Sequence, residues 1–298
     1  MSAAIAVSLA AFVRGRPALD RERFISYWRD VHGTLAARVP DSQLYRIHVL
    51  DPASPLLLGL PEGVEGTAGE GECFDGIAEL RWSAAADLER WSVSPALTEF
   101  VAEDEQNVFG YCAVYWARGD NVVEAKDEIP EMVVDGPQVL PTVIVAARRA
   151  AGAGRDALGA YLRDTLVPAF AAEPGVVRAT LHLLDPYGGE WDSPNVGHEG
   201  EGDFEAWVEL TFAGFDACGA ALGAAPVRSA LAASSGTAGA LHAYLERETY
   251  TLRRGGAPTL VGLRGYQAAR TMLAIGARNQ LRPEVLKVSA GTSGGVGR

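Results

Sequence analysis

The sequence contains almost no lysine, few cysteines and no long apolar run. Lys126 and Lys287 are the two lysines among 26 basic residues in a chain of 298, and the formal net charge is −12. An acidic surface repels phosphate backbones, so we do not expect a nucleic-acid partner. No segment approaches the roughly 20 apolar residues that a membrane-spanning helix needs, so a membrane partner is not expected either.

Cysteine is also scarce, with Cys73, Cys112 and Cys218 far apart in the chain. An odd number of cysteines without a CxxC motif argues against both a structural zinc site and a disulfide framework. We therefore expect reduced thiols, a cytoplasmic location and no bound metal. The apolar start, residues 3–13, lacks the preceding basic residues of a signal peptide, and its alternation predicts a first strand instead.

The remaining composition is that of a globular protein with an uneven charge. Hydrophobic residues make up 48% and charged residues 21%, and the length admits one large domain or two of ordinary size. Residues 245–298 hold nine basic and three acidic residues, a net charge of +6, which leaves −18 for the rest of the chain. This asymmetry indicates that the C-terminal segment is a separate piece.

Three segments of the first half recur in the second half in the same order. The pairs are 27–30 (YWRD) with 161–164 (YLRD), 48–52 (HVLDP) with 182–186 (HLLDP), and 74–80 with 204–210. The first two pairs share an offset of 134 residues and the third has an offset of 130. Ordered matches at a nearly constant offset predict a tandem duplication.

Each repeat has the pattern of a β-α-β-β-α-β unit, the order of a ferredoxin-like fold. Asp20 is expected to cap a first helix, whose apolar face comprises Phe24, Trp28, Val31 and Leu35. One such unit leaves a sheet face bare, so we expect the two sheets to face each other. The predicted fold class is α+β: two ferredoxin-like repeats that form an intramolecular pseudo-dimeric α+β barrel, with a C-terminal helical extension. The predicted divisions are repeat 1 at 1–118, a linker at 119–140, repeat 2 at 141–252 and the extension at 253–298.

Strand alternation assigns side chains to the lumen between the sheets. The lumen set comprises Leu44, Arg46, His48, Leu50, Asp75, Ile77, Glu79 and Arg81 in repeat 1, and His182, Glu205, Trp207, Glu209 and Thr211 in repeat 2. The opposite faces, which include Phe74 and Phe204, are expected under the helices.

Two pairs in this lumen set have the chemistry of proton transfer. A buried carboxylate beside an imidazole shifts both pKa values, which makes His48 with Glu79 and His182 with Glu209 candidate pairs. The alternative is that each pair only satisfies its own buried groups. A register slip of one residue would also reverse both faces of the strands.

His32 is a further candidate, one turn after Trp28 on the first helix. The corresponding position in repeat 2 holds Leu166. A pseudo-dimer with a single active site needs its catalytic residue in only one of the two repeats. The presence of a histidine in repeat 1 alone therefore favours a functional role for His32. A capping or core histidine is the alternative.

Together these residues resemble the EthD domain, a family of the dimeric α+β barrel superfamily. The resemblance rests on Phe24, Tyr27, Trp28, His32, the FDGIAE run at 74–79, Ser94-Pro95 and Asp104-Glu105. It spans most of residues 1–118, and residues 140–252 resemble a degenerate copy that keeps Tyr161 and Glu209. The resemblance implies His32 as the acid–base residue, with Tyr27, Trp28, Asp75 and Asp104 at motif positions.

The resemblance also implies a small-molecule enzyme. We expect a cofactor-independent lyase or isomerase, of the dehydratase, decarboxylase or isomerase type, for an apolar, oxygenated aromatic or polyketide-like substrate. His32 would move a proton, assisted by Glu79 or His48. The expected substrate-binding residues are Tyr27, Trp28, Arg46, Asp75, Ile77, Arg81, His182, Trp207 and Glu209. Two alternatives stay open: a non-catalytic ligand-binding barrel, and an oxidoreductase that uses oxygen directly or a haem ligated by His32 or His182.

The C-terminal segment predicts one helix at 264–281, followed by a Gly/Ser/Thr tail. Apolar residues such as Tyr266 and Leu273 alternate there with Arg270 and Arg278. We expect this helix to dock on the acidic repeats by charge and apolar contact. A homodimer bridged by the segment is the alternative.

Overall fold

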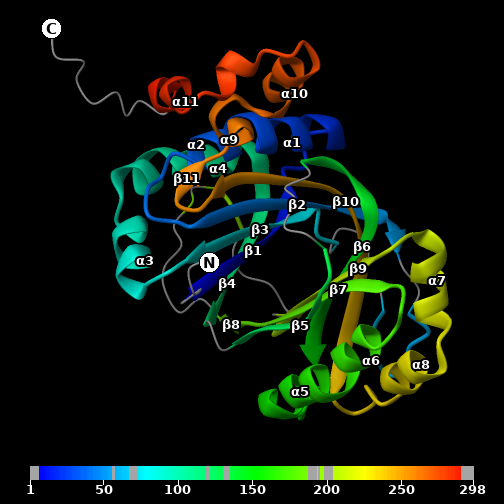
Figure 1. Cartoon of the computed structure of the whole chain (residues 1–298). Coiled ribbons are helices and arrows are strands. Elements are labelled where there is room, and N and C mark those ends of the chain that lie inside the picture. The colour runs from blue at the N-terminus through cyan, green and yellow to red at the C-terminus, as the bar shows by residue number, and fades with distance from the viewer. Residues whose placement is uncertain are drawn as a thin grey trace, which may run out of the picture.

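The computed structural model describes residues 7–55, 58–66, 73–118, 121–129, 135–186, 193, 195–197 and 204–289. Within these residues the protein is a mixed α+β structure, with strands that curl around a common interior and helices on the outside (Figure 1). This is the fold class that the sequence predicts.

The first half begins with strand β1 and a helix that Asp20 caps, since its side chain accepts a hydrogen bond from the backbone N–H of Arg23. The elements are β1 (Val7–Gly15), α1 (Arg21–Tyr27), a π-helical turn (Trp28–His32), α2 (Gly33–Ala36), β2 (Leu44–Pro55), β3 (Gly76–Trp82), α3 (Ala85–Ser92), a second π-helical turn (Ala96–Val101), α4 (Ala102–Val108) and β4 (Phe109–Arg118).

The second half has a similar order of elements, with the two additional strands β5 and β8. Its elements are β5 (Val122–Asp127), β6 (Gly136–Arg149), α5 (Arg155–Tyr161), a π-helical turn (Leu162–Leu166), α6 (Val167–Ala171), β7 (Val176–Leu183), β8 (Asp185–Pro186), β9 (Ala206–Phe212), α7 (Phe215–Gly223), α8 (Ala225–Ala232) and β10 (Ala238–Arg254). Strand β5 lies inside the stretch predicted as a linker and pairs with β7. Strand β10 extends beyond the predicted end of repeat 2 at residue 252, so the basic residues from 245 onward belong partly to the barrel.

The strands form one antiparallel sheet in the order β5-β7-β9-β6-β10-β2-β3-β1-β4-β8. The halves meet along β10 and β2, which pair from Leu44 to Pro55. At the other end of the strand order, β4 pairs with β8, and β8 follows β7 in the chain after a single residue. The sheet therefore curls back toward its own beginning and encloses a lumen.

Alternation along the strands separates an outer face from a lumen face, as predicted. Tyr45, Ile47 and Val49 of β2 pack under the helices of the first half, in one buried cluster with Trp28. A corresponding cluster in the second half includes Val208 and Leu210 of β9. A third cluster fills part of the lumen and comprises Ala10, Phe12, Leu50, Phe74, Ile77, Ala113, Tyr115, Ala117, Ile144, Ala146, Leu184, Phe204, Trp207 and Tyr244.

The prediction was wrong for Phe74 and Phe204, which lie in the lumen cluster. Both residues precede the regular part of their strands, because β3 begins at Gly76 and β9 begins at Ala206. The two-residue period therefore does not extend to them. Phe74 instead contacts Phe204 and Phe12 across the lumen, with ring centroids 5.7 and 5.1 Å apart.

The C-terminal segment docks on the first half but is not the single helix predicted. It comprises β11 (Ala257–Pro258), α9 (Leu260–Arg264), α10 (Tyr266–Ala274), a 3₁₀ turn (Arg278–Leu281) and α11 (Pro283–Ser289). Gly265 and Gly276 break the helix with φ values of 78° and 70°, which favour glycine. The backbone N–H of Tyr266 donates to Asp30 at 2.5 Å, and the Arg29 guanidinium lies over the Tyr266 ring.

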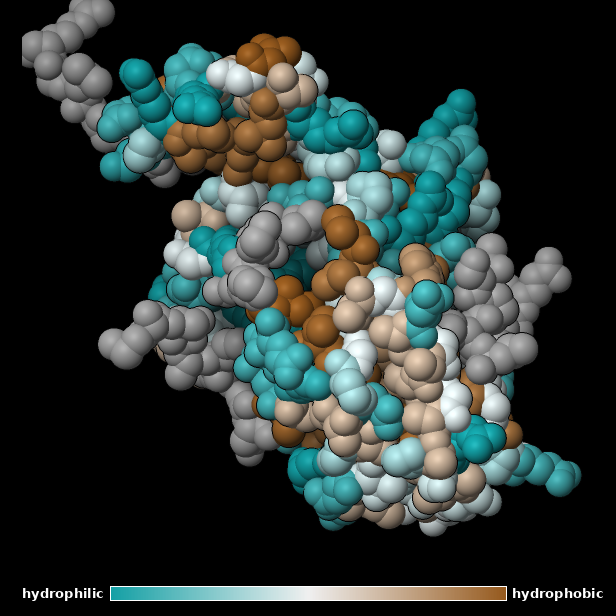
Figure 2. Space-filling model, turned by 45° about the vertical axis from the view of Figure 1, so that its right-hand side comes forward, coloured by the Kyte–Doolittle hydropathy of each residue, from teal (hydrophilic) through white to brown (hydrophobic). Residues whose placement is uncertain are grey.

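The outer side of this segment carries exposed apolar side chains. Leu273, Ile275 and Val288 are more than half exposed, and apolar side chains gather over the C-terminal helices in the upper part of Figure 2. The homodimer through this segment remains a prediction.

Candidate functional site

The predicted site residues occupy two separate regions on opposite faces of the sheet. His32 lies beneath the helices of the first half, in a cavity that Tyr45 and Leu80 also line. His48 lies in the lumen, because it alternates with Tyr45 and Ile47 along β2. The prediction that Glu79 or His48 assists His32 was therefore wrong: the sheet separates them.

The π-helical turn at Trp28–His32 determines the orientation of His32. Such a turn contains one residue more than an α-helical turn and shifts the side chains that follow it. Val31, predicted on the apolar face, is 47% exposed, whereas His32 is 4% exposed. The imidazole packs edge-on against Phe109, with ring centroids 5.2 Å apart.

His32 forms a dyad with Asp104, a residue of α4. The Nδ1 atom of His32 lies 3.0 Å from Oδ2 of Asp104, and the Tyr27 hydroxyl donates to Oδ1 at 2.6 Å. Asn107 donates to the same oxygen at 3.0 Å. Burial opposes ionisation of Asp104, but these hydrogen bonds outweigh it and lower its pKa to about 2.

Tyr27 is held in its neutral, donating form. Burial and the Asp104 carboxylate together raise the pKa of Tyr27 to about 12. Trp28, predicted to bind substrate, packs against Phe24 and Phe109 and lines the cavity. The motif residues Tyr27, Trp28, His32 and Asp104 thus meet at one place, which we call the outer site.

The outer site opens into a cavity of about 40 Å³ between the helices and the sheet. Its lining is mostly apolar and comprises Leu9, Ala11, Val13, Trp28, His32, Ala36, Tyr45, Ala78, Leu80, Trp91, Leu97, Val101, Glu105, Phe109 and Cys112. Burial raises the pKa of the Tyr45 hydroxyl and of the Cys112 thiol, so both stay protonated at neutral pH. Glu105 is buried and accepts a hydrogen bond from Ser193.

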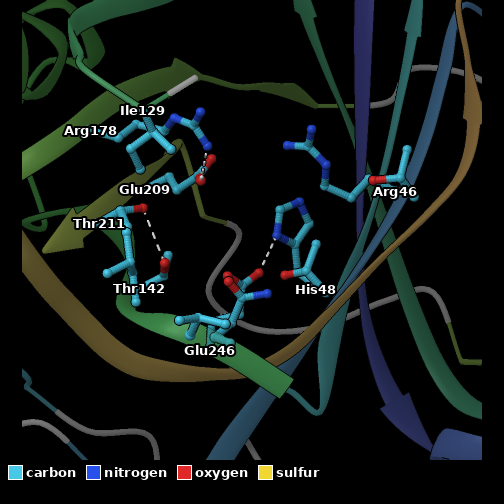
Figure 3. Close-up of a pocket in the computed structure, with 13 residues that line it drawn as sticks. Arg46, His48, Ile129, Thr142, Arg178, Glu209, Thr211 and Glu246 are labelled. Atoms are coloured by element: carbon cyan, nitrogen blue, oxygen red, sulfur yellow. Dashed lines mark hydrogen bonds and ion pairs between the residues drawn. The ribbon is translucent and has the colours of Figure 1, made fainter. Parts of the chain in front are cut away.

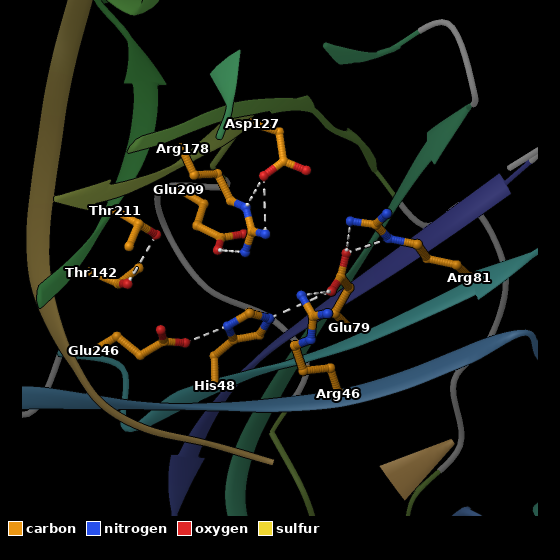
Figure 4. A network of polar contacts seen from close by, with 10 residues as sticks. All are labelled: Arg46, His48, Glu79, Arg81, Asp127, Thr142, Arg178, Glu209, Thr211 and Glu246. Atoms are coloured by element: carbon orange, nitrogen blue, oxygen red, sulfur yellow. Dashed lines mark hydrogen bonds and ion pairs between the residues drawn. The ribbon is translucent and has the colours of Figure 1, made fainter. Parts of the chain in front are cut away.

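The lumen contains a network of charged side chains centred on His48 (Figure 4). Its Nδ1 atom lies 2.5 Å from Glu246 and its Nε2 atom lies 3.5 Å from Glu79. Burial disfavours the imidazolium, but the two carboxylates outweigh it and raise the pKa of His48 to about 9. The predicted proximity of His48 and Glu79 is thus present, and Glu246 is an additional partner.

Glu79 also pairs with two arginines that the sequence placed in the lumen. Arg81 lies 2.6 Å and Arg46 lies 3.7 Å from its carboxylate. Burial opposes ionisation of Glu79, and Arg81 contributes most to holding its pKa well below the ordinary value. Ile77 packs beside them in the lumen cluster.

The second predicted pair, His182 with Glu209, forms no ion pair or hydrogen bond in the described structure, and each residue has another neighbour. Glu209 lies 3.6 Å from Arg178, which also bonds Asp127. The His182 ring stacks on Trp207, with centroids 4.1 Å apart. Burial lowers the pKa of His182 to about 3, so it is neutral.

Asp75 lies away from the lumen pocket, contrary to its predicted position. Its carboxylate accepts hydrogen bonds from the backbone N–H of Gly15 at 2.8 Å and from Arg21 at 2.9 Å. Like Phe74, it precedes β3, so strand alternation does not apply to it. Asp75 thus links the end of β1 to the start of α1.

Several lumen residues were not identified from the sequence. They are Glu246, Thr249 and Thr251 of β10, Thr142 of β6 and Arg178 of β7. The lumen face of β10 was not assigned from the sequence, and a bulge between Glu246 and Glu248 interrupts its alternation. Arg178 and Thr142 lie on strands whose lumen faces were not assigned.

A haem does not fit beside either candidate histidine. The His182 ring is 1% exposed and covered by Trp207. The cavity at His32 has a volume of about 40 Å³, far below the roughly 300–1,000 Å³ of pockets for larger ligands. Among the described residues, no group of three or more metal-ligating side chains comes together. None of the described helices has the length and apolarity needed to cross a membrane.

Comparison with solved structures finds proteins that resemble this chain in fold at low sequence identity. An anthrone oxidase-like protein superposes with a TM-score of 0.50 at 12% identity, covering 86% of this chain and 97% of its own. A proposed monooxygenase from Fusobacterium nucleatum subsp. nucleatum gives 0.48 at 9% identity, with 87% and 99% covered. One from Lactobacillus acidophilus gives 0.45 at 10% identity, with 86% and 98% covered. No curated protein matches the sequence.

The family model for the EthD domain matches residues 16–110. This range includes Tyr27, Trp28, His32 and Asp104 of the outer site, and most of the cavity lining. Residues 16–110 are thus similar to the EthD domain, and the fold of the chain is similar to that of the anthrone oxidase-like protein.

Proposed function

We propose that the protein is a small-molecule enzyme that performs acid–base chemistry at the outer site, with His32 as the proton-transferring residue. The observation that supports this most is the His32–Asp104–Tyr27 arrangement at the wall of an apolar cavity. Such an arrangement occurs once in the described structure, since the counterpart of His32 in the second half is the buried Leu166.

The geometry suits a general base. An ionised Asp104 accepts the Nδ1 proton of His32 and so fixes the tautomer in which Nε2 carries the lone pair. Nε2 then accepts a proton from the substrate, and the Asp104 carboxylate stabilises the imidazolium that forms. Tyr27 keeps Asp104 in place, because its hydroxyl donates to the oxygen that His32 does not use.

The lining defines the class of substrate. An apolar molecule with an acidic C–H or O–H next to a carbonyl would match the apolar walls, with the hydroxyl of Tyr45 as a polar contact. After proton abstraction, the imidazolium can return the proton to a departing hydroxyl or to another carbon. Dehydration and isomerisation use this sequence. In a decarboxylation the substrate carboxylate would instead leave as CO₂, and the protonated His32 would supply a proton to the enolate that remains.

The cavity must widen to admit an aromatic ring, because about 40 Å³ holds little more than water. Trp91, Leu97 and Val101 form one part of the wall on the helical side of this cavity. Leu97 and Val101 lie on the π-helical turn between α3 and α4, and its neighbour Phe100 is 56% exposed. We propose that this turn moves outward when substrate enters.

Deuterium exchange at the acidic carbon of anthrone, followed by NMR in anaerobic D₂O, tests the proposal. The protein should accelerate exchange, and His32→Ala should lower the rate by about 10²-fold or more. Asp104→Asn should also lower it, because it removes the charge that stabilises the imidazolium. Leu166→Ala in the second half is the control and should retain the rate.

An unchanged exchange rate in His32→Ala would remove this residue from the chemistry. Acceleration that appears only in air, together with consumption of oxygen, would favour the oxidoreductase alternative. A Soret absorption band in the purified protein would contradict the spatial argument against haem.

A further inference from the structure

We propose that the barrel lumen contains a second ligand site, separate from the outer site, in which Arg46 binds a small organic carboxylate. The site lies at the seam between the two halves, where β10 pairs with β2. It shares no lining residue with the outer cavity. Its function is independent of proton transfer by His32.

The site is a cavity of about 120 Å³ with walls from both halves (Figure 3). The lining comprises Arg46, His48, Ile129, Gln138, Val139, Leu140, Thr142, Arg178, Glu209, Thr211, Glu246, Thr249 and Thr251. The strand register explains why these side chains meet: Thr251 is paired with Arg46 and Thr249 with His48 across the seam. Paired residues of adjacent strands point to the same face of a sheet.

Arg46 is the cation in this cavity whose charge is least compensated. Its one ion pair is with Glu79 at 3.7 Å, and Arg81 already holds the same carboxylate at 2.6 Å. The Asp135 carboxylate, which accepts a hydrogen bond from the backbone N–H of Thr251, also interacts electrostatically with Arg46 but forms no ion pair with it. Arg46 makes no hydrogen bond within the described residues, and its side chain is 22% exposed. Its guanidinium points into the open part of the cavity in Figure 3, where it offers paired donors that match a carboxylate.

The other charges in the cavity have partners of opposite sign. Glu246 pairs with His48 at 2.5 Å, and Glu209 pairs with Arg178 at 3.6 Å. Arg178 is further neutralised by Asp127 at 3.2 Å. An anion that enters the cavity therefore meets two carboxylates that already have partners and the Arg46 guanidinium, which could exchange its long contacts with Glu79 and Asp135 for hydrogen bonds to the anion.

Hydroxyl groups complete the polar wall. Thr142 and Thr211 bond each other at 3.1 Å. The Oγ1 atom of Thr249 is buried and has no hydrogen-bond partner in the described structure. A buried hydroxyl without a partner is unfavourable, and a ligand that formed a hydrogen bond with it would remove this cost. Thr249 is thus the second group, beside Arg46, that points to an occupant.

The volume limits the size of the ligand. A cavity of roughly 150 Å³ holds one benzene molecule, so about 120 Å³ holds a slightly smaller one. The polar lining disfavours a hydrocarbon. A carboxylate with two to four carbons, with or without a hydroxyl group, meets both conditions.

Isothermal titration calorimetry of the full chain at pH 7.5 tests the proposal with acetate, propanoate and lactate as probes. Propanamide, which is similar in shape to propanoate but neutral, is the ligand control. At least one carboxylate should bind saturably at one site per chain, and propanamide should not. Inorganic phosphate should bind more weakly than the best carboxylate.

Arg46→Gln should weaken carboxylate binding at least tenfold, and Arg46→Lys should retain part of it. Thr249→Val should weaken binding with little change in volume. Arg148→Gln is the matched control, because Arg148 lies on β6 of the same barrel but pairs with Glu65 at the surface. Thermal unfolding shows whether each variant is folded.

Three results would overturn the proposal. The first is that no carboxylate binds to the wild-type chain at concentrations up to roughly 10 mM. The others are that folded Arg46→Gln binds the carboxylate as tightly as the wild type, or that propanamide binds as tightly as the carboxylate. If Arg46→Gln does not fold, the Arg46→Lys and Thr249→Val variants decide, since unchanged binding in both contradicts the assignment.

Discussion

His48 and His182 show how far the surroundings of a residue determine its charge. The two residues occupy corresponding positions in the two halves, on β2 and β7, and both are 1% exposed. His48 lies between Glu246 and Glu79, which raise its pKa to about 9 against the effect of burial. His182 stacks on Trp207 without an adjacent carboxylate partner, and burial lowers its pKa to about 3. At neutral pH one is a cation and the other is neutral.

The raised pKa of His48 makes part of the stability dependent on pH. The folded state binds the proton more tightly than the unfolded state, whose histidine pKa is near 6.5. The contribution is therefore complete below pH 6.5 and is lost as the pH rises through about 9. A shift of this size corresponds to at most about 3 kcal/mol.

We predict that His48→Gln abolishes most of the pH dependence of unfolding between pH 6.5 and 9. Urea unfolding of the wild type and of His48→Gln at several pH values measures this dependence. If wild type and His48→Gln lose stability in parallel across this range, the assigned charge of His48 is wrong.

The lowered pKa of His182 makes stability depend on pH in the opposite direction, in the acidic range. Below pH 6.5 the histidine of the unfolded state binds a proton, whereas His182 in the folded state stays neutral down to about pH 3. The free energy of unfolding therefore falls as the pH is lowered through this range. The slope is about 1.4 kcal/mol per pH unit for one group. His182→Phe, which keeps an aromatic ring on Trp207, should therefore be less sensitive to acid than the wild type. Thermal melts at pH 7 and pH 5 compare the two proteins, and an equal decrease in Tm would contradict the prediction.

At the scale of elements, the outer site depends on a helix that is not regular. Sequence periodicity placed Val31 on the buried face, whereas the π-helical turn at Trp28–His32 buries His32 and exposes Val31. The periodicity of an ideal helix contains no signal for the additional residue. Contacts with Phe109 and Asp104, which are remote in sequence, hold the turn. The sequence therefore indicated His32, Tyr27 and Asp104 as motif positions, but not the contacts that join them.

Close packing of α9 gives a prediction for the C-terminal segment. A Cβ atom on Gly262 would lie 1.9 Å from the backbone oxygen of Leu252, so the helix cannot keep its position with alanine there. We expect Gly262→Ala to lower the free energy of unfolding by about 3 kcal/mol. Gly219→Ala in α7 is the control, because nothing lies within 4 Å of its Cβ position.

At its exposed helical position, Gly219→Ala should raise the free energy of unfolding by about 0.5–1 kcal/mol. Chemical denaturation measures both variants. Equal stability of Gly262→Ala and the wild type would show that α9 does not pack against β10 in solution.

At the scale of the whole molecule, the lumen cluster joins both halves. Phe12 and Ile77 come from the first half, and Ile144 and Trp207 come from the second. Neither half can bury its lumen face without the other. We therefore expect the two halves to unfold together in a single transition.

The substitution Ile144→Ala tests this coupling, since Ile144 is completely buried in the lumen cluster. The cavity should cost about 2–5 kcal/mol and move one common transition, seen by both calorimetry and circular dichroism. Val139→Ala on the same strand is the control, because Val139 is 78% exposed. Two separate transitions would contradict a shared core.

The sequence was sufficient for the order of elements and for most strand faces, because alternation is a local property. Arg46, His48 and Glu79 were placed in the lumen for this reason, and the structure agrees. It was insufficient for Glu246, whose proximity to His48 depends on the register between β10 and β2. That register joins residues about 200 positions apart, and no local pattern records it. Asp75 shows the remaining error, since alternation was extended beyond the end of a strand.

The two seams of the barrel differ in length, and this difference determines where the molecule fluctuates. β10 and β2 pair along most of their length, whereas β4 and β8 meet only at Tyr115–Trp116 and Asp185–Pro186. Proline has no N–H to donate, so the shorter seam is weaker still. Local opening has its lowest free energy there, and backbone amides of this edge should exchange with solvent first. We therefore expect the aromatic end of the lumen, near Tyr115 and Leu184, to open more readily than the charged end around Arg46.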